Sequence, residues 1–195
     1  LLTRAVFPET VAPMLGDINW NQDAPYNNAC PLVQGSRSMT GCVATAMAMI
    51  LKYHNFPVKG KGTHSYKTSS GLECSFDYGS TTFSWNEMRS QYVGGNYTTE
   101  EANAVAELMH ACGVAVDMEY SPSSSGAYPF KVGQALIDYF GYDENLGYVC
   151  RQYFTSEEWM NMIKTELSER RPVLYNGASK DVGHEFVFDG YDSQD

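Results

Sequence analysis

Two residues of this chain have the types and surroundings that nucleophilic chemistry needs, Cys42 and His184. Cys42 follows Gly41 at the start of an alanine-rich segment with helical spacing. A thiol in that position faces the positive end of the helix dipole and several unpaired N–H groups. Both effects favour the thiolate, which is the nucleophilic form. Taken singly, such a cysteine is most simply a small buried apolar residue, and a histidine at a strand end is most simply an exposed one.

The separation of the two residues strengthens the chemical interpretation. His184 opens an apolar segment directly after Gly183 and lies 142 residues beyond Cys42. Papain-type peptidases place a base histidine about 130–150 residues after a cysteine at a helix start. The local signature of papain itself, Cys-Gly-Ser-Cys-Trp, is missing. We therefore interpret Cys42 and His184 as a candidate nucleophile and base.

The elements that must position these residues can be predicted from periodicity and capping signals. Apolar residues at helical spacing predict a helix over 42–54 that stops at Asn55-Phe56-Pro57. Capping boxes at Thr98 and Thr155 predict two further helices, the first ending at Gly113 and the second burying Trp159, Ile163 and Leu167. The remaining predictions are a helix over 130–140, strands over 173–176 and 184–190, a loop-like segment over 1–40 and an irregular, β-prone segment over 60–97.

Composition excludes several classes of protein. With 195 residues, of which 43% are apolar, the chain can form a full-sized core, which excludes disorder along its whole length. A net charge of −10 argues against a nucleic-acid partner, because contact with phosphates needs a basic surface. No apolar stretch is long enough for a transmembrane helix.

The cysteines and the remaining histidines give no signal for a metal site. The five cysteines are an odd number and none forms a Cys-x-x-Cys pair, so neither a zinc site nor a redox pair is indicated and at least one thiol stays outside any intramolecular disulfide. His64 has no cysteine or carboxylate at ligand spacing. We expect no metal and no organic cofactor.

Several segments resemble one family in the same order along the chain. Gly41-Cys42-Val43-Ala44-Thr45-Ala46 and the following Lys52-Tyr53-His54-Asn55 are similar to the active-site helix of the streptopain/interpain family. Further similar segments are Trp20-Asn21-Gln22, Pro25-Tyr26-Asn27, Asp117-Met118-Glu119-Tyr120, Pro122-Ser123-Ser124, and Gly183-His184 with Phe186-Val187 and Asp189-Gly190. The resemblance runs from about Val6 to Asp192. Members of this family are secreted bacterial cysteine peptidases with a papain-like fold.

The resemblance implies a role for individual residues. Cys42 would be the nucleophile, and His184 its general base and later the acid for the leaving amine. Gln22 matches the glutamine whose side-chain amide donates to the oxyanion together with the Cys42 backbone N–H. Without the resemblance, Gln22 is an ordinary polar loop residue.

The resemblance also implies where substrate lies. The floor and wall of the family's substrate cleft are matched by small residues, which leave room for an apolar side chain next to the scissile bond. These residues are Ser124, Gly126, Ala127, Ala178 and Gly183.

The chain departs from the family pattern in three ways. The Gly- and Trp-rich run that carries the residue orienting the histidine should follow His184 by about sixteen residues, but the sequence ends at Asp195. The residue after His184 is Glu185, where better-known members carry alanine, and a carboxylate there either raises the basicity of His184 or points away. The loop between Gln22 and Cys42 is shorter than in streptopain, so the role of Gln22 depends on an alignment across a deletion.

These observations predict an α+β protein with a papain-like two-lobed fold, in which a helical lobe carries Cys42 and an antiparallel β lobe carries His184. Residues 1–5 are interpreted as a propeptide remnant and 6–195 as the catalytic domain, with the C-terminal part of the β lobe missing. The expected function is that of a secreted cysteine endopeptidase, extracellular or on the cell surface of a bacterium, that matures from a zymogen.

The expected partners are protein or peptide substrates, the protein's own propeptide as inhibitor, and the missing C-terminal segment, whether continuous or a separate fragment. Two alternatives stay open. One is a peptidase fold that has lost activity and only binds peptide, and the other is a secreted structural domain in which Cys42 is disulfide-bonded.

Overall fold

The computed structural model describes residues 6–180 and 182–194. The propeptide remnant predicted over 1–5 lies outside these residues. The helices are α1 (Cys42–His54), α2 (Thr99–Ala115), α3 (Lys131–Phe140) and α4 (Ser156–Ser168), with short 3-10 turns η1 (Val93–Gly95) and η2 (Arg151–Tyr153). The strands are β1 (Thr10–Val11), β2 (Leu32–Val33), β3 (Ser36–Arg37), β4 (Thr63–Lys67), β5 (Glu73–Asp77), β6 (Val173–Ala178), β7 (Gly183–Phe188) and β8 (Tyr191–Asp192). Within the described residues, no helix is both long and apolar enough to cross a membrane.

Helix α1 forms where the periodicity predicts it, and it is the centre of the molecule. Every residue from Val43 to Ala48 is buried, so the helix is covered on all sides rather than along one face. Alanines make this possible, because they favour helix and let neighbouring elements approach closely. The helix ends at Asn55, which adopts the left-handed conformation and donates its N–H to the carbonyls of Leu51 and Lys52.

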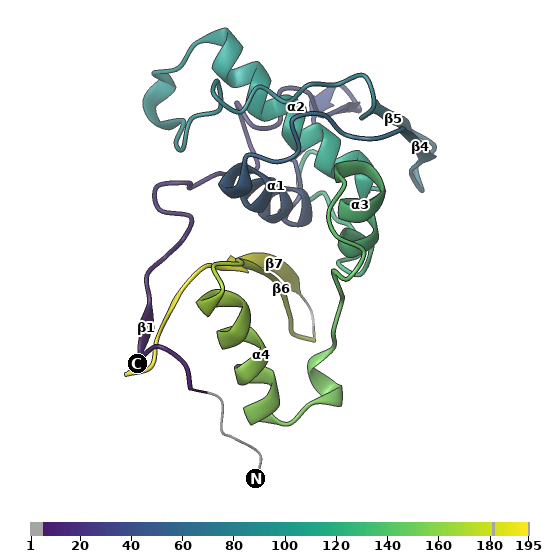
Figure 1. The fold of residues 1–195 in the computed structure, drawn as a ribbon. Coiled ribbons are helices and arrows are strands. Elements are labelled where there is room, and N and C mark those ends of the chain that lie inside the picture. Colours follow the sequence, from purple (N-terminus) through teal and green to yellow (C-terminus); the bar gives the residue numbers. More distant parts are fainter. Residues whose placement is uncertain (1–5, 181, 195) are drawn as a thin grey trace.

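Helix α2 packs against α1, and α3 and the β4–β5 hairpin pack against α2, so that these elements form the helical lobe (Figure 1). The Thr98 capping box is present, but α2 continues two residues past Gly113, so the predicted stop is wrong. A Cβ at position 113 would lie 2.2 Å from the Tyr120 hydroxyl. Gly113 is therefore required by close packing inside the helix, not by a turn at its end. Helix α3 ends at Gly141 as predicted, with φ at 70°.

Strands β6 and β7 lie between α1 and α4 and form the β lobe with α4 (Figure 1). The two strands are antiparallel, with Val173 opposite Phe188 and Ala178 opposite Gly183. The capping box at Thr155 starts α4 as predicted. Of its predicted apolar stripe only Leu167 is buried, whereas Trp159 and Ile163 are half-buried.

The two lobes differ in how completely they are buried. The main apolar cluster extends from Trp20 to Phe140 and lies in the helical lobe. Among the described residues after Phe140, only Leu167 and Glu185 are buried. The sequence prediction also missed the pairing of β1 with β8, which brings Val11 opposite Tyr191 and joins the two ends of the chain. Such a long-range pairing of two-residue strands leaves no periodic signal in the sequence.

Candidate active site

Cys42 is the first residue of α1, and its side chain is half-buried. The helix has no side-chain cap and no acidic residue in its first turn. The N–H groups of a helix's first turn have no partner inside the helix, so they and the helix dipole act on the Cys42 thiol without a competing carboxylate.

The backbone before Cys42 is held tightly in place. Gly41 has φ 85°, a conformation that favours glycine, and a Cβ there would lie 2.6 Å from the Met118 sulfur. The Gly41 carbonyl accepts hydrogen bonds of 3.0 Å from both the N–H and the hydroxyl of Thr45. The hydroxyls of Thr40 and Thr45 lie 2.8 Å apart and are buried. The glycine that precedes Cys42 is therefore fixed by backbone conformation and by packing.

Gln22 lies next to this segment, although a loop separates it from Cys42 in sequence. Its carbonyl accepts a hydrogen bond of 3.1 Å from the N–H of Thr40, two residues before Cys42. Its side chain is half-buried and makes no hydrogen bond within the described ranges 6–180 and 182–194. The side-chain amide is therefore available to a substrate oxygen near the start of α1.

The segment that contains Ser124, Gly126 and Ala127 is anchored to the same place. Met39 donates its N–H to the Ser121 carbonyl at 3.0 Å, and the Ser125 hydroxyl donates to the Met39 carbonyl at 2.7 Å. Ser124 and Gly126 are exposed and Ala127 is half-buried. Three of the five residues expected to contact substrate are thus held beside the residues that precede Cys42.

His184 is the second residue of β7, and α1 packs against β7 more extensively than against β6. The His184 side chain is exposed, and its ring stacks on Phe186 with centroids 6.4 Å apart. Gly177 is its partner across the sheet, next to the pair formed by Ala178 and Gly183. The fold therefore places His184, Ala178 and Gly183 together at one end of the β6–β7 sheet.

Asp189 does not orient His184. Its carboxylate accepts a hydrogen bond of 3.0 Å from the N–H of Leu15, and its carbonyl accepts one of 2.9 Å from Met14. This carboxylate therefore anchors the N-terminal segment. The expectation that sequence beyond Asp195 supplies an orienting group stays a prediction.

Glu185 is buried, although nothing in the sequence pattern around it predicts this. Only 3% of its surface is exposed, and neither carboxylate oxygen has a hydrogen-bond partner within the described residues. Burial raises the pKa of Glu185 to about 7, and the side chain of Asn176 offsets part of the rise. The signal that sequence reasoning could have used is the alternation of β7, which turns Glu185 to the opposite face from His184.

A separate polar cluster joins the β4–β5 hairpin to the start of the 117–126 loop. His64 Nε2 lies 2.6 Å from one oxygen of Asp117, and Lys131 Nζ lies 2.7 Å from the other. The sequence has no carboxylate at ligand spacing from His64, and the fold brings Asp117 to it across 53 residues. No cluster of three or more metal-ligating side chains occurs within the described part of the chain.

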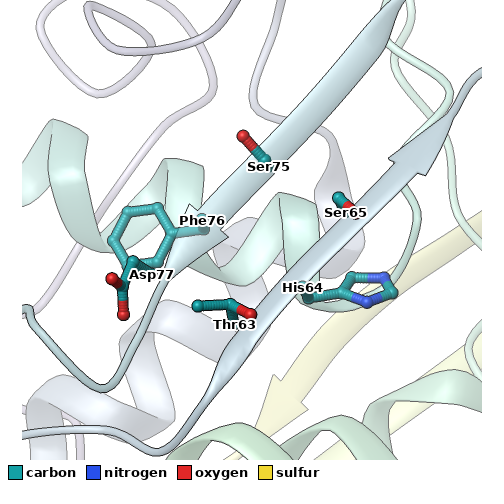
Figure 2. Close-up of a pocket in the computed structure, with 6 residues that line it drawn as sticks. All are labelled: Thr63, His64, Ser65, Ser75, Phe76 and Asp77. Atoms are coloured by element: carbon teal, nitrogen blue, oxygen red, sulfur yellow. The ribbon is translucent and has the colours of Figure 1, made fainter.

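The hairpin also carries a shallow depression of about 480 Å³. Figure 2 shows that its lining residues come from both strands, from Thr63 to Ser65 on β4 and from Ser75 to Asp77 on β5. None of the residues predicted to act in catalysis or substrate binding lines it. We place the candidate active site at the start of α1 for this reason, and not in this depression.

All five cysteines have free thiols, Cys42 among them. The alternative in which Cys42 belongs to a disulfide-bonded structural domain is therefore wrong.

The chain is similar to known cysteine proteases over almost its whole length. Streptopain of Streptococcus pyogenes is 36% identical over 195 residues, which cover 91% of this chain and 48% of that protein. The thiol protease/hemagglutinin PrtT of Porphyromonas gingivalis is 35% identical over 196 residues, which cover 95% of this chain and 22% of that protein. The chain thus spans about half the length of the streptopain that it matches.

Two solved structures have the same fold. Active wild-type interpain A cysteine protease of Prevotella intermedia has a TM-score of 0.90 and 40% identity, covering 96% of this chain and 80% of that one. A fragment of prointerpain A from the same organism has a TM-score of 0.88 and 41% identity, covering 96% of this chain and 60% of that one. These likenesses confirm the predicted α+β papain-like fold. Since the model of the Peptidase C10 family matches residues 20–195, the chain belongs to that family.

Proposed function

We propose that this chain is the catalytic part of a bacterial cysteine endopeptidase that cleaves peptide bonds in proteins. The observation that carries the proposal is the position of Cys42, a free thiol at the uncapped start of a buried helix that packs against the strand of His184. Membership of the Peptidase C10 family supports it. So do relatives named as thiol or cysteine proteases.

In the proposed reaction, the Cys42 thiolate attacks the carbonyl carbon of the scissile peptide bond. The C–N bond then breaks, and the imidazolium of His184 gives its proton to the leaving amine. This leaves a thioester between Cys42 and the acyl half of the substrate. His184 next takes a proton from water, which attacks the thioester, and the carboxylic acid product leaves as the thiol is restored.

The oxyanion formed in both steps lies beside the start of α1. The Cys42 backbone N–H and the side-chain amide of Gln22 are the proposed donors, and the free amide and the bond from Thr40 to the Gln22 carbonyl support this. Removing one such donor costs about 10²–10³ in rate in a well-studied protease. Ser124, Gly126, Ala127, Ala178 and Gly183 are the proposed substrate contacts. No metal or organic cofactor takes part in this scheme.

We further propose that the protein is made as a zymogen and exported. The similarity to prointerpain A supports a propeptide that precedes the catalytic part and inhibits it. The names and sources of the relatives support a secreted bacterial protease that acts on proteins. The residues that follow 195 in a longer protein would then complete the β lobe.

The decisive variant is Cys42→Ala. We expect loss of all measurable hydrolysis of a quenched fluorescent protein substrate, with an unchanged circular dichroism spectrum, because the side chain is small and only half-buried. Cys150→Ala is the matched control, since Cys150 is also a half-buried free thiol but lies outside the proposed site. Turnover retained by the Cys42 variant would refute the proposed nucleophile.

The alternative of an inactive peptide-binding module gives a different result. In that case the native chain binds peptide without cleaving it, and brief treatment with iodoacetamide labels Cys42 no faster than the other four thiols. Preferential labelling of Cys42, located by mass spectrometry, supports the enzyme. This labelling needs no substrate and no completed β lobe.

A further inference from the structure

Glu185 is a buried acid that has no partner in the described structure. Only 3% of the residue is exposed, and neither carboxylate oxygen has a hydrogen bond of ordinary geometry there, although the Asn176 amide lies near enough to lower the pKa of the acid. The Asn176 amide, directly across the sheet, donates instead to the His184 carbonyl at 3.4 Å. Buried carboxylates are normally paired or hydrogen-bonded, because leaving them unpaired costs free energy. A buried acid whose polar neighbour in the described chain is one neutral amide, with no cation beside it, points to an external ligand.

The same face of the sheet carries two of the proposed substrate contacts. Alternate residues of a strand share a face, so Gly183 and Glu185 lie on one face of β7. Ala178 and Asn176 are their direct partners on β6 and therefore share that face. Gly183 and Ala178 are exposed, and a Cβ added at Gly183 would meet no atom within 4 Å. This face is therefore uncovered at Gly183 and Ala178, whereas Glu185, two residues further along β7, is enclosed.

No basic side chain of the described chain neutralises Glu185. The elements packed against β7 are α1 and β6, and β6 brings no charged residue. On α1, Lys52 donates to the Trp85 carbonyl at 2.8 Å, and the other titratable groups, Cys42 and His54, lie at opposite ends of the helix. The 141–155 segment brings Tyr148, whose pKa is raised first by burial and in smaller part by Cys150 and Glu185.

We propose that Glu185 is a specificity-determining residue that binds a lysine or arginine side chain of the peptide substrate close to the scissile bond. This inference rests on the proposed function. A substrate that lies along Ala178 and Gly183 passes two residues from Glu185, or about 7 Å along the strand. Lysine and arginine carry their charge at the end of a long apolar stem, so such a side chain covers that distance.

The structure also predicts how strong and how pH-dependent this preference is. A hydrogen bond to a charged group shielded from water favours the correct ligand by about 10- to 100-fold. The raised pKa of Glu185, about 7, means that the carboxyl is neutral in mildly acidic solution and charged above neutrality. The preference for a cation should therefore be full at pH 8 and decline as the pH falls to 5.5.

The test uses peptidyl chloromethyl ketones that alkylate Cys42, with lysine or its neutral isostere Nε-acetyl-lysine at the first, second or third residue from the reactive group. We expect the lysine reagent to label the native chain at least about 10-fold faster at one of these positions at pH 8. At pH 5.5 the Glu185 carboxyl is neutral, so the ratio of the labelling rates of the two reagents should approach 1. Plain iodoacetamide, which has no side chain to recognise, measures the intrinsic reactivity of Cys42 in parallel.

Two variants assign the preference to Glu185. Glu185→Gln keeps the shape and removes the charge, so the lysine to acetyl-lysine ratio should fall to about 1 while the iodoacetamide rate is unchanged. Glu185→Ala, which removes the carboxyl group altogether, should give the same ratio. Glu119→Gln is the control, because Glu119 is an exposed carboxylate on the helical lobe that bonds to Ser69.

Equal labelling by the two reagents in the native chain at pH 8 overturns the inference, whatever the variants do. A preference for lysine that persists in Glu185→Gln also overturns it, because another group then binds the cation. The failure of the proposed function is recognised by a separate measurement, because iodoacetamide would then label Cys42 no faster than the other thiols. If Cys42 of the native chain is reactive but the two peptide reagents label it equally, the role of Glu185 is rejected and the proposed function stands.

Discussion

Two carboxyl groups of this molecule, Asp117 and Glu185, have opposite environments. Asp117 lies at the junction of the β4–β5 hairpin and the 117–126 loop, and it receives His64 on one oxygen and Lys131 on the other. Glu185 lies on β7, which packs against α1, and the described chain brings it no cation and only the neutral amide of Asn176. Asp117 is one-third exposed, whereas Glu185 is almost fully buried.

The pKa values move in opposite directions for this reason. Burial by itself would raise the pKa of Asp117, but the hydrogen bonds and charges of Lys131 and His64 outweigh it, so the pKa is lowered. Burial acts almost unopposed on Glu185 and raises its pKa to about 7. An acid with cations from its own chain therefore holds the fold together, whereas an acid without them is open to a cation from outside.

The largest expected effect is the pH dependence of stability that Glu185 creates. Its folded-state pKa lies above its ordinary value of 4.5, so the folded state binds the proton more tightly than the unfolded state. Stability is therefore full below about pH 4.5 and declines as the pH rises through about 7, by about 3 kcal/mol at most. Glu185→Gln should remove this decline, as measured by urea unfolding at pH 5 and pH 8. If the free energy of unfolding changes equally between pH 5 and pH 8 in the native chain and in the variant, the ionisation of Glu185 does not affect stability.

The burial of Glu185 is a feature that the sequence does not predict. The position of Cys42 at a helix start and of His184 at a strand start could be read from periodicity, because both depend on local signals. The burial of Glu185 depends on how α1 packs against β7, although β7 begins 129 residues after the end of α1. The bond between His64 and Asp117 is missed for the same reason, since 53 residues separate them.

The glycines show the same difference between local and long-range signals. The helix end at Gly141 is predicted correctly, because backbone conformation at a helix end is a local property. Gly113 is mistaken for a stop because the sequence does not show that Tyr120 packs on it. Likewise, the capping box of α4 is found from its sequence, but the half-buried state of Trp159 is not, since exposure depends on which elements cover the helix.

Replacing Asp117 should have the next largest effect. Asp117→Ala removes the acceptor of two hydrogen bonds and places alanine at φ 52°, a conformation that favours Asn, Asp and Gly. We expect a loss of about 2 kcal/mol in the free energy of unfolding at pH 7, discounted for the partial exposure of all three side chains. Asp117→Asn is the control, because it tolerates the backbone conformation and keeps acceptor capacity on one atom, and it should lose about half as much.

The pH dependence of stability in acid separates the contribution of the Asp117 charge from that of its shape. Because the folded-state pKa of Asp117 is lowered, the stability that its charge provides is present above the ordinary value of 3.8 and is lost as the pH falls through the folded value. Asp117→Asn should lack this part of the acid unfolding transition. An identical acid transition in the two proteins would mean that the ion pairs contribute nothing to stability.

The smallest expected effect concerns Glu119, two residues after Asp117 on the same loop. Its carboxylate accepts the N–H of Ser69 on both oxygens at 3.0 Å and the Ser69 hydroxyl at 2.8 Å, so it also ties the loop to the hairpin. Unlike Asp117, it is exposed and its partner is uncharged. Water can replace each bond, so we expect Glu119→Gln to cost less than about 0.5 kcal/mol in urea unfolding at pH 7. Ser69→Ala, which keeps the backbone donor, should cost no more. A loss as large as that of Asp117→Ala would show that the loop is held by the number of its contacts with the hairpin and not by the charged partners of Asp117, and the contrast between paired and unpaired acids would then lose its basis.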